Sequence, residues 1–108
     1  MMKAIPEKDW KLLRSMKDAK LNQACEQILG AVVSVIINKG NENHKAYLEV
    51  WEKIQTGDNE IAEMFNDLRR SNAVSKLVAW KRYGFLTESE LNGFSEETQS
   101  TIELIAGN

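Results

Sequence analysis

Hydrophobic residues recur at helical spacing along almost the whole chain. After Pro6, large apolar side chains follow at intervals of three residues, at Trp10, Leu13 and Met16. Proline is tolerated in the first turn of a helix, where its missing N–H has no partner to lose. We therefore predict a first helix that begins near Pro6 and ends near Lys17.

A second helix is predicted from Asp18, a suitable N-cap, to the polar turn at residues 38–41. The β-branched run "AVVSVII" at residues 31–37 would also suit a buried strand. We favour a helix, because the apolar stripe continues through this run and the chain offers no second strand to pair with it. The stripe consists of Leu21, Cys25, Ile28, Val32 and Ile36.

The longest predicted helix covers about residues 43–70 and is expected to form the centre of the fold. Tyr47, Ile54, Ile61 and Leu68 recur in it every seven residues. Gly57 and its neighbouring aspartate change the composition but not the phase of this repeat. The phase therefore predicts one continuous helix.

After Leu68 the phase changes, which predicts a turn at residues 70–72 followed by a helix that ends at Gly84. Thr87 and Glu90 match a capping box, and Ser95 can cap a last helix. The chain as a whole is predicted to be all-α. It forms one domain, residues 1–108, in which five or six helices pack as a compact bundle with the long helix at about 43–70 in its centre.

Composition indicates a globular protein without a strong global charge. Apolar residues make up 43% of the 108 residues, charged residues 28%, and the net charge is −2, so nothing draws the whole surface to nucleic acid or to an anionic membrane. The longest apolar stretch is too short to cross a bilayer. The single cysteine, Cys25, cannot form an internal disulfide, and we expect a reducing bacterial cytoplasm with no membrane association.

Motifs for catalysis or cofactor binding are absent from the sequence. Cys25 and His44 provide the only possible Cys/His couple, and we interpret the first as core packing and the second as an exposed residue near a helix start. The glutamates of the long helix lack the Glu-x-x-His pairs of di-metal bundles. We predict no catalytic residues, no metal and no cofactor.

The segment "LRRSNAVSKLVAWKRYGFL", residues 68–86, carries five basic side chains and no acidic one. Much of this basic charge is what two successive helix C-termini favour. Lys76, Trp80 and Tyr83 share a helix face, however, and arginines anchor protein interfaces well. The candidate partner-binding residues are therefore Arg69, Arg70, Lys76, Trp80 and Tyr83.

One of the two arginines is also expected to form a structural ion pair, with Glu88 or Glu90. Asp67 is too close in sequence to face either arginine if all three lie on one helix.

Three stretches of the chain resemble a family of short uncharacterised bacterial proteins. They are "EKDWKLLR", "FNDLRRSNAVSKLVAW" and "GFLTESELNGFSEET", which correspond to a D-W-x-L-L-R opening, an F-x-D-L-R-R-S centre and an L-T-x-x-E-L tail. That family has no established activity. The resemblance implies a compact helical fold and no particular mechanism.

These observations favour a non-enzymatic protein that binds another protein or itself, with a homodimer as the first expectation. The alternative is a module that binds nucleic acid through the basic and aromatic segment at residues 69–83, where cations would contact phosphates and rings would stack on bases.

Overall fold

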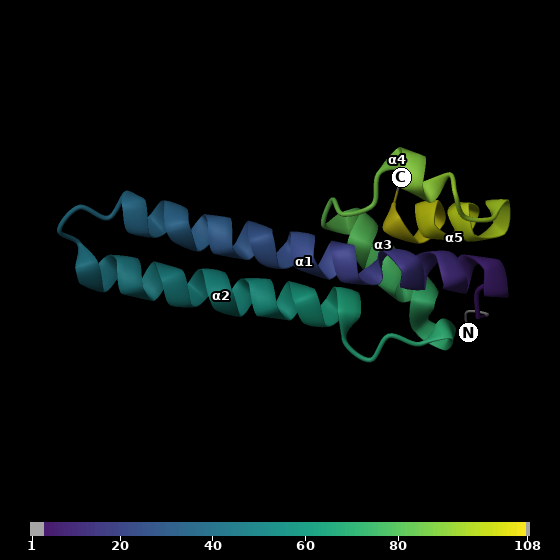
Figure 1. Ribbon diagram of the computed structural model, residues 1–108, viewed down its shortest axis with the longest axis horizontal. Coiled ribbons are helices and arrows are strands. Elements are labelled where there is room, and N and C mark those ends of the chain that lie inside the picture. Colours follow the sequence, from purple (N-terminus) through teal and green to yellow (C-terminus); the bar gives the residue numbers. More distant parts are fainter. Residues whose placement is uncertain (1–3, 108) are drawn as a thin grey trace.

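A computed structural model describes residues 4–107, and every regular element within that range is helical (Figure 1). The all-α prediction is confirmed, with five α-helices in the described range. They are α1 (Glu7–Ile37), α2 (Asn43–Phe65), α3 (Ala73–Arg82), α4 (Glu88–Leu91) and α5 (Glu96–Ala106), and a short 3-10 turn, η1 (Arg70–Asn72), precedes α3.

Helix α1 runs for 31 residues without a break. The predicted end near Lys17 and the predicted cap at Asp18 are therefore wrong. Asp18 is exposed in the middle of the helix, and no proline or glycine lies between its start and residue 29. The β-branched run at residues 31–37 is helical, as predicted, because it continues a helix that is already formed.

Helix α2 is continuous through Gly57, as predicted, but it ends at Phe65 and not at about residue 70. Asn66 is extended and Asp67 has a left-handed φ of 55°, so the chain leaves the helix axis before it reaches the arginines. The predicted turn at 70–72 is the 3-10 turn η1.

The remaining helix ends follow the predicted caps. Gly84 comes just after α3 with a left-handed φ of 81°. The hydroxyl of Thr87 accepts a hydrogen bond from the N–H of Glu90, whose side chain accepts one from the N–H of Thr87, and this completes the capping box of α4. Ser95 caps α5 through the N–H of Thr98.

The molecule consists of a packed head and a projecting arm. The arm consists of residues 25–37 of α1, the turn at 38–42 and residues 43–56 of α2, and the head contains the rest of residues 4–107 (Figure 1). The radius of gyration is 16.6 Å, against about 13 Å for a compact chain of this length. The largest fully buried apolar side chains all belong to the head: Trp80, Leu13, Met64, Leu77, Leu91 and Ile102.

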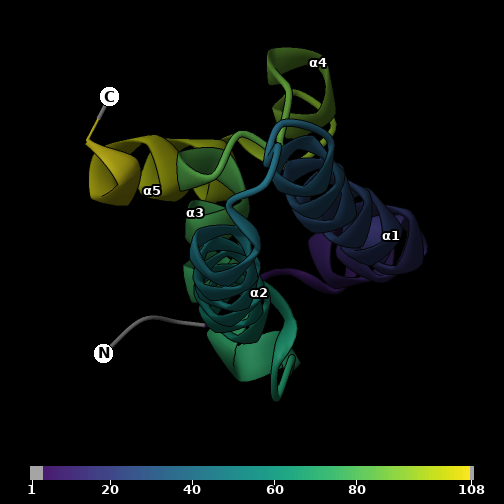
Figure 2. The same cartoon turned by 90° about the vertical axis from the view of Figure 1, so that its left-hand side faces the viewer.

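Helices α3, α4 and α5 all lie on one side of the plane that contains α1 and α2 (Figure 2). Tyr83, which follows α3, and Phe85 reach the space between α1 and α2 from that side. The head therefore covers one side of the helical pair, and the helices of the head leave its other side open.

Gly57 allows α1 and α2 to approach closely. A Cβ atom built at this glycine would lie 2.5 Å from both Cδ1 and Cγ1 of Ile28 on α1, which is far inside van der Waals contact. Isoleucine is stiff at χ1 and cannot move aside freely. The glycine that interrupts the composition of α2 is thus a packing requirement.

We expect Gly57→Ala to lower the free energy of unfolding by about 1–2 kcal/mol, since overpacking outweighs the roughly 1 kcal/mol that alanine contributes to helix propensity. Gly30→Ala on α1 is the control, because a Cβ there meets nothing within 4 Å. It should raise the unfolding free energy by about 0.5–1 kcal/mol. Urea titration measures both, and stabilisation by both variants would contradict the close approach at Gly57.

A buried carboxylate links the start of α1 to the start of α5. Asp9 is 0% exposed, and its carboxylate accepts hydrogen bonds from the N–H and the hydroxyl of Ser95, at 2.9 and 2.6 Å, and from the hydroxyl of Thr98, at 2.6 Å. Burial alone would raise the pKa of Asp9, but these hydrogen bonds outweigh burial and hold the pKa below its ordinary value. The ionised carboxylate therefore stabilises the packing of α5 on α1.

The pH dependence of folding should report this carboxylate. Because the pKa of Asp9 is lower in the folded protein than the unfolded value of about 3.9, its contribution is present above that pH and is lost as the pH falls through the folded pKa. We expect Asp9→Asn to cost on the order of 2 kcal/mol at pH 7 and much less below pH 3. Chemical denaturation at both pH values measures this difference. Asp18→Asn, at an exposed site on the same helix, should cost little at either pH, and an equal loss for Asp9→Asn at both would refute the assignment.

Candidate interaction surface

The two arginines predicted to bind a partner form ion pairs within the chain. Arg69 lies 2.9 Å from Asp67, which corrects the expectation that this aspartate cannot face an arginine. The two residues meet because Asp67 lies beyond the end of α2. Arg70 donates to the carbonyl oxygen of Ile5 at 2.8 Å and to the carboxylate of Glu7 at 3.1 Å. It therefore ties the start of α1 to η1.

The partners expected for an arginine, Glu88 and Glu90, pair with lysines instead. Lys81 lies 3.6 Å from Glu88. Lys20 of α1 lies 2.7 Å from Glu90, and this contact joins α1 to the capping box of α4. The expectation of a structural ion pair is met by Arg70, but with Glu7 as its partner.

Trp80 lies in the core and offers no surface to a partner. Its side chain is 0% exposed, its indole N–H donates to the carbonyl oxygen of Met64 at 3.0 Å, and its ring packs on Phe65 with centroids 5.6 Å apart. This burial corrects the sequence-based assignment of Trp80 to a partner-binding face. The tryptophan anchors α3 to the end of α2.

Lys76 and Tyr83 both contact the last turn of α2. The ammonium of Lys76 donates to the carbonyl oxygens of Ala62 and Glu63, at 3.3 and 3.0 Å, where a cation complements the negative end of a helix. The phenol of Tyr83 donates to the carboxylate of Glu63 at 2.9 Å, and this hydrogen bond raises the pKa of Tyr83. These two predicted site residues thus come together, but as an intramolecular clamp.

A different surface of the molecule is strongly apolar. Six large side chains on the arm are between 50% and 66% exposed, and we call them the apolar arm face. They are Leu29, Val33 and Ile36 of α1, and Tyr47, Trp51 and Ile54 of α2.

The six residues gather on one side of the arm. At about 100° per residue, each set of three spans about 60° of its helix. Ile28 and Gly57 mark the line of contact between the two helices. Counted along the chain direction of each helix, each set lies about a quarter turn from this line, in the same rotational sense. Because α1 and α2 run antiparallel, equal turns in the same sense bring both sets to the same side.

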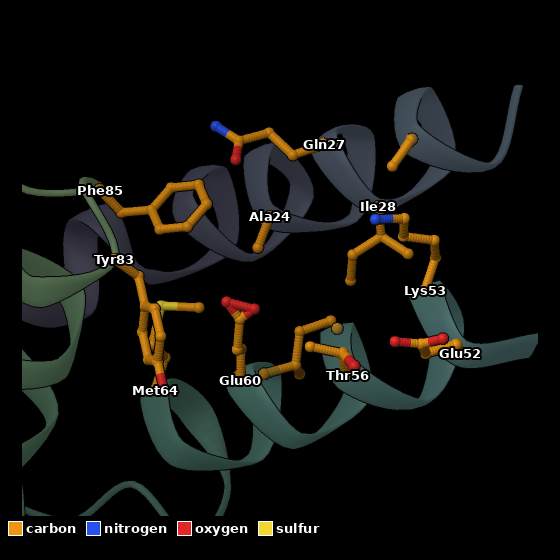
Figure 3. A pocket seen from close by; sticks show the side chains of 13 residues that line it. Ala24, Gln27, Ile28, Glu52, Lys53, Thr56, Glu60, Met64, Tyr83 and Phe85 are labelled. Carbon is orange, nitrogen blue, oxygen red and sulfur yellow. The ribbon is translucent and has the colours of Figure 1, made fainter. Parts of the chain in front are cut away.

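The opposite side of the arm is more polar and bears a groove of about 360 Å³ between α1 and α2, which polar and apolar residues line alike. Figure 3 shows Glu60 of α2 and Ala24 of α1 pointing toward each other across this groove, with Thr56 beside Glu60 and Tyr83 at the inner end of the groove. The head lies on this polar side. None of the six residues of the apolar arm face lines the groove, so the arm has two distinct faces.

The size of the apolar arm face distinguishes it from ordinary surface. At roughly 150–250 Å² for each fully exposed aromatic side chain and less for each aliphatic one, the six present on the order of 500–650 Å² to solvent. The largest apolar patch of a typical monomer is about 300–600 Å², and each partner in a standard protein interface buries about 800 Å². The apolar arm face is therefore at the upper end of the range for monomers and approaches the area that one partner buries in a standard interface.

Sequence reasoning missed this surface, although the signal was present. It placed Cys25, Ile36, Tyr47 and Ile54 on stripes that face the core. In the structure Cys25 is half-buried, and Ile36, Tyr47 and Ile54 are at least half exposed. The period of the stripes was identified correctly, but no element of residues 4–107 covers their outer members Ile36, Tyr47 and Ile54.

Two other kinds of site, a metal centre and a membrane span, can be compared with residues 4–107. No three histidine, cysteine, aspartate or glutamate side chains gather there in a way that could hold a metal ion. No helix in this range is long and apolar enough to cross a membrane. Comparison with protein-family models, with curated proteins and with solved structures returns no match.

Proposed function

We propose that this protein is a non-enzymatic interaction protein that self-associates as a homodimer through the apolar arm face. The observation that carries this proposal is the position of six large, exposed apolar side chains on the one side of the arm that the helices of the head leave open. A pair of helices alone cannot bury such a face. A second helical pair can, by forming a four-helix bundle.

The proposal also includes the cellular compartment. Self-association takes place in a reducing bacterial cytoplasm, where the single Cys25 stays a thiol. A different protein that presents a helical apolar surface of its own would be the other partner of this face.

Thermal unfolding at several protein concentrations tests the proposal. A dimer that unfolds to separate chains gains stability with concentration by mass action, and we expect the Tm to rise by about 3 °C or more for each tenfold increase. A monomer unfolds at a Tm that does not depend on concentration. A Tm that stays constant over about two decades of protein concentration, roughly 1 to 100 μM, would refute self-association.

Nucleic-acid binding through residues 69–83 is the alternative, and it has weaker support. Arg69, Arg70 and Lys81 form ion pairs with acidic side chains, and Lys76 binds backbone carbonyls. Trp80 cannot stack on a base from within the core. Fluorescence anisotropy with labelled DNA and RNA at low salt distinguishes the two functions, because only the alternative predicts binding that weakens steeply as salt rises.

A further inference from the structure

The residues of the apolar arm face are distributed evenly about one position along the length of the arm, where Val33 and Trp51 lie side by side. Gly57 of α2 lies directly against Ile28 of α1. Val33 lies five residues beyond Ile28 toward the tip, and Trp51 lies six residues from Gly57 in the same direction. At about 1.5 Å per residue, these two positions are level to within about 2 Å.

The other four residues of the face flank this level evenly. Leu29 and Ile36 lie four residues before and three residues after Val33, and Tyr47 and Ile54 lie at the same spacings around Trp51. A two-fold axis that crosses the arm at this level, perpendicular to its length, therefore carries the face approximately onto itself. In an isologous antiparallel contact about this level, apolar positions of one copy would therefore meet apolar positions of the other along the whole face.

We infer that the occupant of the apolar arm face is the arm of a second copy, packed antiparallel, with Val33 and Trp51 next to the two-fold axis and the two heads at opposite ends. This arrangement rests on the proposed self-association and specifies its geometry. The two arms form a four-helix bundle, and the polar groove of each copy faces outward into solvent.

Polar side chains in the head half of α1 support antiparallel packing. The stripe that carries Leu29 and Ile36 in the arm continues toward the head as Lys11, Asp18 and Asn22, which are polar and exposed. In an antiparallel dimer each head extends past the tip of the other copy, so these polar residues stay in solvent. A parallel dimer would press them against the same polar stretch of the second copy and leave them without water.

The acidic residues at the head end of the face favour the same arrangement. Asp58 lies seven residues from Trp51 on the head side and His44 lies seven residues away on the tip side. The antiparallel axis brings Asp58 level with His44 of the partner subunit, and Glu26 close to Lys39 of the partner subunit. A parallel dimer would instead bring the acidic residues of the two copies together.

Chemical cross-linking tests the arrangement, with single cysteines introduced in a Cys25→Ser background. One chain carries His44→Cys and another Asp58→Cys, and both are treated with a bis-maleimide that spans up to about two helical turns, or 11 Å. Within one chain the two positions are 14 residues apart on α2, or about 21 Å. Only contact between copies can therefore join them.

We expect a covalent dimer when the two variants are mixed and exchanged, and at least tenfold less product from either variant alone. Efficient cross-linking of His44→Cys with itself, or a dimer that gives no product in the mixture, would overturn the antiparallel arrangement while self-association stands. The mass of each variant is measured before the reagent is added. A monomeric mass for both variants and for the Cys25→Ser parent would overturn self-association itself.

Discussion

The substitution Val33→Glu should convert the protein into a folded monomer. Val33 is 51% exposed in the single chain, so the new side chain reaches water there and the fold is kept. In the dimer, the two introduced carboxylates would lie close to the two-fold axis, unpaired and close to each other. Burying such like charges costs on the order of 3 kcal/mol or more, which corresponds to at least a hundredfold weaker association.

Ser34→Glu is the matched control for this variant. Residue 34 is the next position on α1, it is also exposed, and it lies on the polar side of the arm. The same charge on the same helix should leave the dimer intact. Sedimentation velocity of both variants at equal concentration measures the difference. Equal association of the two would contradict the assignment of the contact to the apolar arm face.

Trp80→Ala should produce the largest loss of folding stability. The ring is fully buried and its N–H satisfies the carbonyl oxygen of Met64. Removing it leaves a large cavity and an unsatisfied acceptor, for a cost of about 3–5 kcal/mol. Denaturant titration in the Val33→Glu background measures this cost in the monomer. A loss below about 1 kcal/mol would contradict the position of Trp80 in the core.

Trp51→Ala is the matched comparison for Trp80→Ala, because it makes the same substitution on the arm and not in the core. Trp51 is 58% exposed in the single chain, so in the monomeric background it should change the unfolding free energy by no more than about 0.5 kcal/mol. In the otherwise natural sequence it should weaken association, since the ring lies at the centre of the contact. Trp80 is thus the core anchor and Trp51 the contact residue, the reverse of what the sequence pattern suggests.

Local signals predicted the C-terminal half of the fold well. The turn at residues 70–72, the glycine after α3 and the caps at Thr87 and Ser95 are all present as expected. Each of these features depends on a few neighbouring residues that satisfy the first or last hydrogen-bonding groups of a helix. Such features can be identified from a sequence because they do not depend on distant parts of the chain.

The same local reasoning failed at Asp18, where an aspartate inside a helix was interpreted as a cap. An aspartate on the solvent side of a continuous helix costs little, and no glycine or proline accompanies it to end the helix. Tertiary packing then allows α1 to continue past Asp18, because α2 packs against the outer half of α1 and stabilises it there.

The candidate site could be predicted only in part, because periodicity identifies which residues avoid water but not what covers them. Tyr47 and Ile54 belong to the heptad repeat of α2 and were expected in the core. Trp80 was expected at the surface because its helix carries apolar residues around most of its circumference. In the structure α3 is buried on nearly all sides, whereas the helical pair of the arm lacks a third layer. This distribution follows from the path of the chain, which no local pattern specifies.

Sedimentation equilibrium of the natural sequence at micromolar concentration tests the central claim most directly. The apolar arm face predicts a particle of twice the 12.3 kDa chain mass that dissociates on dilution. A single 12.3 kDa species that persists up to the highest concentration at which the protein stays in solution would contradict it.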